Sequence, residues 1–276
     1  YIFIMRLSFI IIISICILCC GKHEINKNTV LVFGHGGIGF DDLNGQFAPN
    51  SVASISKALD FYDLDGVEVD VQFTKDGNLI VFHDDYLENS TQCKGYINSL
   101  NFDEIGKCYY RKQYSNNYNE EVISFDSLII LINNHWKHKL FSFDVKNNFD
   151  VPYKVDSLAG FLNNKLKKLI SMDNIYVECN DANILYALKR RSNYECLLVS
   201  SMDSVGVRDV SRFGLDGIVS NFEDVNDKLM KQLLDSSKKI ILHGQKNTRD
   251  YKSVDYKNIY GVQIDNPIAA MKYFKY

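Results

Sequence analysis

Short apolar runs alternate with longer segments of helical periodicity along most of the chain, from Val30 to its last residues. Apolar runs of this length, bounded by polar residues, are typical of buried strands. Between them the apolar residues recur with the spacing of a helix face, most clearly in 51–62 and 154–170. Asn226 is typical of a helix cap, and Pro267 of the first turn of a final helix. We expect eight strands, at residues 30–35, 66–71, 140–146, 174–179, 195–200, 216–220, 239–244 and 260–265.

Eight strands that alternate with helices over roughly 250 residues predict an α/β fold of the (β/α)₈ TIM-barrel type. The alternative is a doubly wound open sheet, but the glycines of "GHGGIG" (34–39) lack the G-x-G-x-x-G spacing of that fold. A further apolar run at 79–83 follows the turn sequence "TKDG" (74–77), which predicts a β-hairpin beside the second strand. Residues 85–122 are rich in Asn, Tyr and Ser, and we expect them to form an irregular insertion over one end of the barrel.

The amino-terminal segment has the pattern of a targeting signal. Arg6 precedes "LSFIIIISICILCC", which is too short to span a bilayer and has the length of a signal-peptide core. It ends in a cysteine pair that resembles a bacterial lipoprotein signal, with Cys20 as the lipidated residue and Cys19 as the second candidate. We expect a signal at 1–20, a tether at 21–29 and the barrel at 30–276, in the cell envelope and attached to the membrane through the lipid alone. An uncleaved anchor or plain secretion is the alternative.

The composition is that of an ordinary globular domain, with 46% hydrophobic residues and a formal net charge of −3. The chain has no excess or cluster of basic residues, so nothing in it indicates a nucleic-acid partner. Four cysteines follow the signal, and their spacing matches no zinc motif. Cys93 and Cys108 are compatible with a disulfide in an oxidising compartment and equally with two buried thiols.

Alternation along the predicted strands places polar side chains inside the barrel. In a closed barrel the residues that face the helices are apolar, and their neighbours along the strand line the interior. Val67, Val69 and Val71 therefore face outward, which turns Glu68 and Asp70 inward. His35 ends the first strand. The same alternation turns inward Ser142, Asp144, Lys146, Tyr176 and Glu178.

These polar residues lie at the carboxyl ends of their strands, where the active sites of barrel enzymes are built. Glu68, Asp70 and Asp144 would repel one another in one mouth unless a cation neutralised them. Oxygen ligands favour a hard divalent cation, Ca²⁺ or Mg²⁺, over zinc. The alternative is a structural salt-bridge network with Lys146. Histidines at the same mouth favour catalysis, since imidazoles exchange protons near neutral pH.

The motifs resemble those of the glycerophosphodiester phosphodiesterase family of the phospholipase C-like phosphodiesterase barrels, whose pattern is H-R-G, E-N-[ST], E-x-D, D-G, H-D, E-x-K and T-D-x-P. The resemblance extends over nearly the whole mature chain and is densest from 34 to 91. The matching residues here are His35-Gly36-Gly37, Pro49-Asn50-Ser51, Glu68-Val69-Asp70, Asp76-Gly77, His83-Asp84, Asp144-Val145-Lys146 and Ile264-Asp265-Asn266-Pro267.

The resemblance implies metal-dependent hydrolysis of a small phosphodiester, a glycerophosphodiester, to an alcohol and glycerol 3-phosphate. It implies that His35 and His83 form the acid/base pair and that the metal ligands are Glu68, Asp70 and Asp144. It also implies that Lys146 meets the phosphate, and that Asn50 contacts the phosphate or holds the site.

Three departures from the family pattern concern the substrate more than the reaction. Gly36 replaces the family arginine and so removes a bidentate phosphate contact. Asp144 replaces a glutamate as the third metal ligand, where Glu178 is a candidate to compensate or to bind substrate. "ILHGQKN" replaces a tryptophan-containing strand and places His243 near the mouth as a candidate substrate contact.

Two other functions are compatible with the same motifs. One is cleavage of intact phospholipids, as in phospholipase C- or D-like enzymes of the superfamily. The other is an inactive surface lipoprotein that binds phosphoryl ligands. The presence of both histidines and all three carboxylates argues against the inactive protein.

Overall fold

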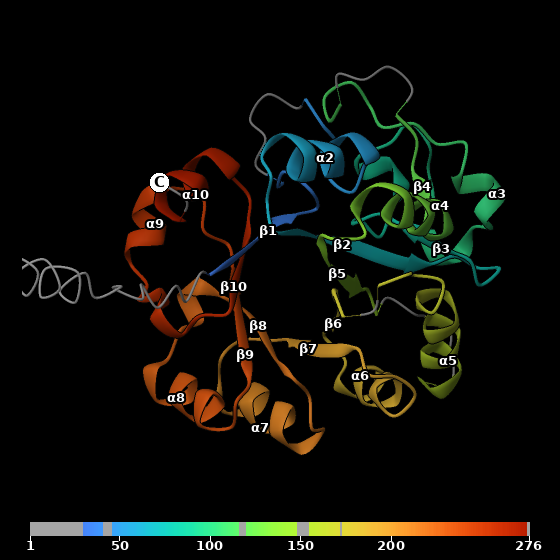
Figure 1. Cartoon of the computed structure of the whole chain (residues 1–276). Helices are drawn as coiled ribbons and strands as arrows, with labels where there is room; N and C mark the ends of the chain where they lie inside the picture. The colour runs from blue at the N-terminus through green and yellow to red at the C-terminus, as the bar shows by residue number, and fades with distance from the viewer. Residues whose placement is uncertain (1–29, 41–45, 116–119, 148–154, 172, 275–276) are drawn as a thin grey trace, which may run out of the picture.

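The computed structural model describes residues 30–40, 46–115, 120–147, 155–171 and 173–274. The predicted signal, tether and lipidation site at Cys20 lie outside the described residues. Eight parallel strands close into a barrel, because the first strand pairs in parallel with both the second and the last (Figure 1). This closure confirms the TIM barrel and excludes the open sheet. The barrel strands are β1 (Leu31–His35), β2 (Gly66–Phe73), β5 (Leu140–Val145), β6 (Ile175–Cys179), β7 (Glu195–Val199), β8 (Gly217–Asn221), β9 (Lys239–His243) and β10 (Gly261–Ile264).

Helices connect the barrel strands and cover the outside of the barrel (Figure 1). The helix expected at 51–62 begins after its cap Ser51 and becomes π-helical halfway. Asn226 caps its helix through the backbone N–H of Leu229, and Pro267 opens the last helix, both as predicted. The helices are α2 (Val52–Ser56) with η1 (Lys57–Phe61), α4 (Phe125–Leu131) with η4 (Ile132–Trp136), α5 (Val155–Leu166), α6 (Ala182–Lys189), α7 (Ser204–Arg212), α8 (Asp227–Asp235), α9 (Thr248–Lys252) and α10 (Pro267–Phe274).

Two apolar clusters fill the space on either side of the barrel wall. The outward-facing residues of the strands pack against the helices in one large buried core. Inside the barrel, a smaller cluster fills the interior below the mouth, so that the polar side chains above it have an apolar floor. Its buried members are Phe33, Tyr176, Leu197, Val219 and Ile241.

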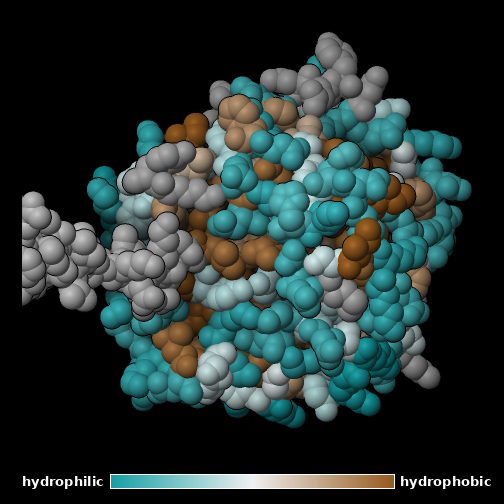
Figure 2. Space-filling model, viewed as in Figure 1, coloured by the Kyte–Doolittle hydropathy of each residue, from teal (hydrophilic) through white to brown (hydrophobic). Residues whose placement is uncertain are grey.

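On the surface, polar residues cover most of the face in Figure 2, and apolar residues form separate patches among them. None of the helices in the described part of the chain is both long and apolar enough to cross a bilayer.

The predicted hairpin is present. β3 (Leu79–Val81) runs antiparallel to β2, and β4 (Ile123–Ser124) runs antiparallel to β3. The segment between them is less irregular than we expected, since it contains η2 (Leu87–Asn89), η3 (Ile97–Ser99) and α3 (Phe102–Ile105). These turns enclose a second core, which the sequence pattern did not reveal because its apolar residues follow no single period. The core consists of Ala48, Ile80, Phe82, Leu87, Ile97, Ile105, Cys108, Tyr110 and Val122.

A disulfide between Cys93 and Cys108 links two turns of this insertion, with the Cα atoms 5.6 Å apart. The disulfide was one of the two possibilities that the sequence left open for this pair. Cys179 and Cys196 are free and buried in the described structure. The cross-link therefore stabilises the insertion rather than the barrel.

We predict that the double substitution Cys93→Ala and Cys108→Ala lowers the free energy of unfolding by about 3 kcal/mol, the value for a loop of about 15 residues. The reason is that the cross-link restricts the unfolded chain. Urea denaturation measures the loss. A reductant should cost the wild-type chain a similar amount and leave the double variant unchanged, whereas an unchanged stability of the double variant contradicts the prediction.

Candidate active site

The polar residues predicted for the barrel interior lie together at the carboxyl ends of the strands. Parallel pairing places His35 beside Glu68, Asp70 beside Asp144, and Asp144 beside Glu178. Every residue of β2 is buried, so its carboxylates are held inside the wall of the barrel. The first half of the mouth is therefore a continuous row of ionisable side chains.

Three of these carboxylates could hold a metal ion. Glu68, Asp70 and Asp144 each offer an oxygen, and the three oxygens lie within 4.8 Å of one another. Burial, and then the charge of Asp70, raise the pKa of Glu68 well above its ordinary value. One oxygen of Glu68 accepts the backbone N–H of Gly36, and the other is buried without a hydrogen-bond partner in the described structure. A buried carboxylate oxygen without a donor, in a set of oxygen ligands, fits a hard cation.

Lys146 lies against the same carboxylates. Its Nζ is 2.6 Å from Asp70 Oδ1 and 2.6 Å from Asp144 Oδ2. Burial would raise the pKa of Asp70, but Lys146, His83 and His35 together outweigh it, and the pKa is lowered. Burial likewise opposes the charge of Lys146, yet both carboxylates together raise its pKa. The salt-bridge network that we weighed as an alternative is thus present, but one ammonium balances only one of three carboxylates.

Asn50 holds Asp70 in place. Its Nδ2 donates to Asp70 Oδ2 at 2.6 Å, and its Oδ1 accepts the backbone N–H of Asp70 at 2.9 Å. Asn50 is fully buried and has a positive φ of 66°, a conformation that asparagine tolerates better than most residues. Of the two roles expected for Asn50, the geometry supports holding the site, because its amide already bonds on both sides.

His35 is oriented by a residue to which we had assigned no role. Its Nδ1 lies 2.8 Å from Asp265 Oδ1, and its Nε2 lies 3.9 Å from Glu68 Oε2. Burial works to raise the pKa of Asp265, but the hydrogen bond with His35, the charge of His35 and the backbone N–H of Phe40 act together against it, and the pKa is lowered. Asp265 directly follows β10. Polar residues at the carboxyl ends of barrel strands line the mouth, and this rule could have identified Asp265 as a site residue.

His83 reaches the mouth from the insertion rather than from a barrel strand. Its Nδ1 is 3.1 Å from Asp84 Oδ1, and this hydrogen bond raises the pKa of His83. The ring of Phe40 stands between the two histidines, with ring centroids 4.6 Å from His35 and 4.7 Å from His83. This position of Phe40 could not be predicted, since loop residues follow no period.

His243 and Glu178 complete the mouth without joining the carboxylate triad. The ring of His243 lies 6.4 Å from that of His35, and burial, followed by the charge of His35, lowers its pKa to about 4. His243 is therefore neutral near pH 7. Glu178 accepts bonds from the Gln263 amide at 2.7 and 2.9 Å and from the Ser142 hydroxyl. Burial, and then Asp144, raise the pKa of Glu178 to about 7.

Similar solved structures have the same fold. A putative glycerophosphoryl diester phosphodiesterase from Silicibacter pomeroyi aligns with a TM-score of 0.77 and 15% identity, over 88% of this chain and 92% of that one. An Oleispira antarctica phosphodiesterase in complex with the product sn-glycerol-3-phosphate aligns with a TM-score of 0.73 and 17% identity, over 86% and 93%. At these identities the likeness concerns the fold alone.

Individual curated proteins match only a short segment of the chain, whereas the family model matches most of it. A glycerophosphodiester phosphodiesterase of Caldanaerobacter subterraneus is 38% identical over 77 residues, 28% of this chain and 29% of that protein. The uncharacterized protein YqiK of Bacillus subtilis is 36% identical over 74 residues, 27% of this chain and 28% of that protein. The chain thus spans less than a third of the length of these relatives. The model of the glycerophosphoryl diester phosphodiesterase family matches residues 43–269, and the chain belongs to that family.

Proposed function

We propose that the chain is a divalent-cation-dependent hydrolase that cleaves glycerophosphodiesters to an alcohol and glycerol 3-phosphate. The observation that carries the proposal is the carboxylate triad at one barrel mouth, with Lys146 and an oriented histidine beside it. Family membership supports the reaction class. The product named in the Oleispira antarctica structure supports glycerol 3-phosphate as the part that this mouth would hold.

At the end of the mouth that would bind the phosphate, charged side chains would supply the main interactions. Glu68, Asp70 and Asp144 would hold a divalent cation, Ca²⁺ or Mg²⁺. When bound, such a cation offsets the charge of the transferring phosphoryl group and helps to activate a nucleophile. Lys146 lies at the edge of the triad and would contact a phosphate oxygen as a point charge. His243, which is neutral, would accept or donate a hydrogen bond to the glycerol part of the substrate.

The two histidines divide the proton transfers between them. The carboxylate of Asp265 holds the proton of His35 on Nδ1, which leaves Nε2 free to accept a proton from the attacking hydroxyl. That hydroxyl belongs to water or to the substrate itself, and the base is the same for both. His83 is the acid that protonates the departing oxygen, because Asp84 helps to keep its ring protonated.

Removal of divalent cations tests the carboxylate triad. We predict that EDTA abolishes turnover of glycerophosphodiesters and that Ca²⁺ or Mg²⁺ restores it, because Lys146 alone does not balance the buried charges. An assay of released glycerol 3-phosphate, before and after chelation, measures this. Full activity after exhaustive chelation would rule out the metal centre.

Alanine substitutions test the two histidines. We predict that His35→Ala and His83→Ala each lower kcat by about 10²-fold or more, since each removes one proton transfer. A nitrophenyl ester, whose leaving group needs little protonation, should rescue His83→Ala far more than His35→Ala. Steady-state kinetics on both kinds of ester measure the difference.

The matched control for these variants is Asp265→Asn, which leaves His35 in place but disturbs its orientation. It should lower activity less than His35→Ala and should not be rescued by the nitrophenyl ester. Near wild-type rates of both alanine variants on glycerophosphodiesters would contradict the mechanism and favour an inactive phosphoryl-binding protein.

The cellular location is a separate proposal that rests on the amino-terminal pattern. We propose that the signal is cleaved before Cys20, that this residue is lipidated and that the enzyme works in the cell envelope. Mass spectrometry of the mature amino terminus should find a lipid-modified cysteine. An unmodified terminus further along the chain would mean secretion instead.

A further inference from the structure

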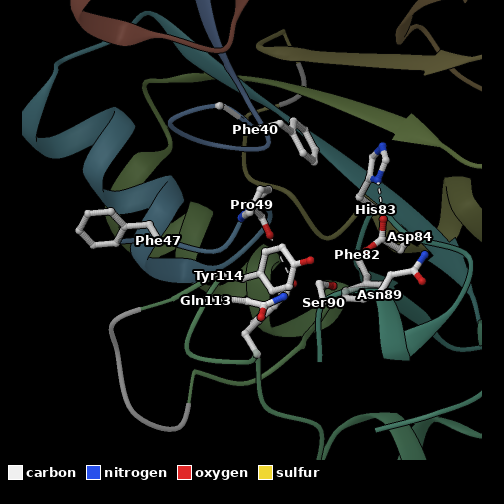
Figure 3. Close-up of a pocket in the computed structure, with 12 residues that line it drawn as sticks. Phe40, Phe47, Pro49, Phe82, His83, Asp84, Asn89, Ser90, Gln113 and Tyr114 are labelled. Carbon is white, nitrogen blue, oxygen red and sulfur yellow. Dashed lines mark hydrogen bonds and ion pairs between the residues drawn. The ribbon is translucent and has the colours of Figure 1, made fainter. Parts of the chain in front are cut away.

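The loop that carries His83 has little packing to hold it. It runs from the end of β3 at Val81 to the start of η2 at Leu87. His83 and Asp84 line the wall of a pocket of about 400 Å³, where the bond between them is visible (Figure 3). The side chain of His83 is 47% exposed, although the ring of Phe40 contacts it. The position of His83 therefore depends on the hydrogen bonds of its loop.

Gln72 supplies two such bonds, one on each side of His83. Its Nε2 donates to the carbonyl of Phe82 at 2.7 Å and to the carbonyl of Asp84 at 3.0 Å. A side-chain amide has two N–H donors, so both are used here, and both go to the backbone next to the histidine. The backbone is thus held immediately before and immediately after His83.

The amide of Gln72 can lie only one way round. Two carbonyl oxygens face its Nε2, and an oxygen in that place would repel both. The side chain is 1% exposed, and its Oε1 is buried without a hydrogen-bond partner in the described structure. An apolar residue of the same size would avoid the cost of this buried oxygen. What the amide contributes in return is the pair of bonds to the loop of His83.

Gln72 lies on the strand that carries two of the three candidate metal ligands. Its neighbours Val71 and Phe73 pack in the outer core. Because side chains alternate along a strand, Gln72 lies on the same face of β2 as Glu68 and Asp70. The inward face of β2 therefore presents two carboxylates and then this amide, in that order toward the mouth.

The backbone of the same strand holds the loop at a further point. The carbonyl of Asp70 accepts the N–H of Phe82 at 3.1 Å, one residue before His83. Asp70 thus belongs to the carboxylate triad through its side chain and supports the loop of His83 through its backbone. One buried strand therefore sets the separation between the triad and His83.

We propose that Gln72 is a positioning residue for the general acid and acts by holding the backbone on both sides of His83. The inference rests on the proposed function for the role of His83 as the acid. A displacement of about 1 Å is enough to slow a proton transfer strongly. Loss of Gln72 should therefore affect the step in which the departing oxygen gains its proton, and should leave binding of the diester unchanged.

Kinetics on two diesters of glycerol 3-phosphate test this role. The ethyl ester needs a proton on its departing oxygen, whereas the nitrophenyl ester needs little. Gln72→Met keeps the volume of the side chain and removes both donors. We expect it to lower kcat for the ethyl ester about tenfold with KM nearly unchanged, and kcat for the nitrophenyl ester by less than about twofold. Gln72→Asn, whose amide is one methylene too short to reach both carbonyls, should give the same pattern and replaces Gln72→Met if that variant does not fold.

A double variant separates positioning from a general loss of stability. Because Gln72 acts through His83, Gln72→Met combined with His83→Ala should be no slower on the ethyl ester than His83→Ala alone. The matched control is Gln245→Met, which removes another fully buried amide and should leave the ratio of the two esters unchanged. Equal losses on both esters, or losses that multiply in the double variant, overturn the inference and leave the proposed function intact.

Histidine NMR makes the test independent of turnover. The chain has six histidines, and the signal of His83 is the one that His83→Ala removes. In a ¹⁵N-labelled chain, Gln72→Met should shift or broaden this signal and leave that of His35 in place. If no diester is hydrolysed but this change is found, the proposed function fails and the positioning of His83 by Gln72 stands. An unchanged His83 signal overturns the inference.

Discussion

Repulsion among three buried carboxylates is the constraint on which the rest of this molecule's mouth depends. Two unit charges 4–5 Å apart repel by about 3–4 kcal/mol at an effective dielectric constant of 20, so three pairs approach the whole stability of a domain. The surrounding groups offset this energy. Lys146 supplies a positive charge, Asn50 supplies two hydrogen bonds to Asp70, and the backbone of Gly36 donates to Glu68. The charge that they leave unbalanced would favour the binding of a cation at this mouth.

The residues of this mouth could be predicted where they lie on strands. A strand that alternates valines with carboxylates can face only one way in a barrel. Its valines must pack against the outer helices, so its carboxylates must face the interior. Burial alone does not distinguish the inward face of β2 from its outward face, since every residue of β2 is buried. The two faces can be told apart because Glu68 and Asp70 are polar. The closed fold follows from the count and spacing of the apolar runs.

Residues outside the strands could not be predicted in this way. The partner of His35 lies 230 positions further along the chain, and no local pattern connects the two. Phe40 and the second core belong to loops, whose apolar residues are placed by packing rather than by a period. The same holds for Cys93 and Cys108, whose pairing depends on how the turns of the insertion fold back on each other.

The bond between His35 and Asp265 joins the first strand of the barrel to the residue that follows the last one. During synthesis β2 and β5, the strands that carry the carboxylates, emerge early and can pair with each other, but His35 gains its orienting partner only when the final strand closes the ring. Contacts over such a separation form late in folding, because a long loop must close first. A nascent chain, or one that lacks its last strand, therefore contains the acidic half of the mouth without an oriented His35. The bond between His35 and Asp265 is thus a direct sign that the barrel has closed.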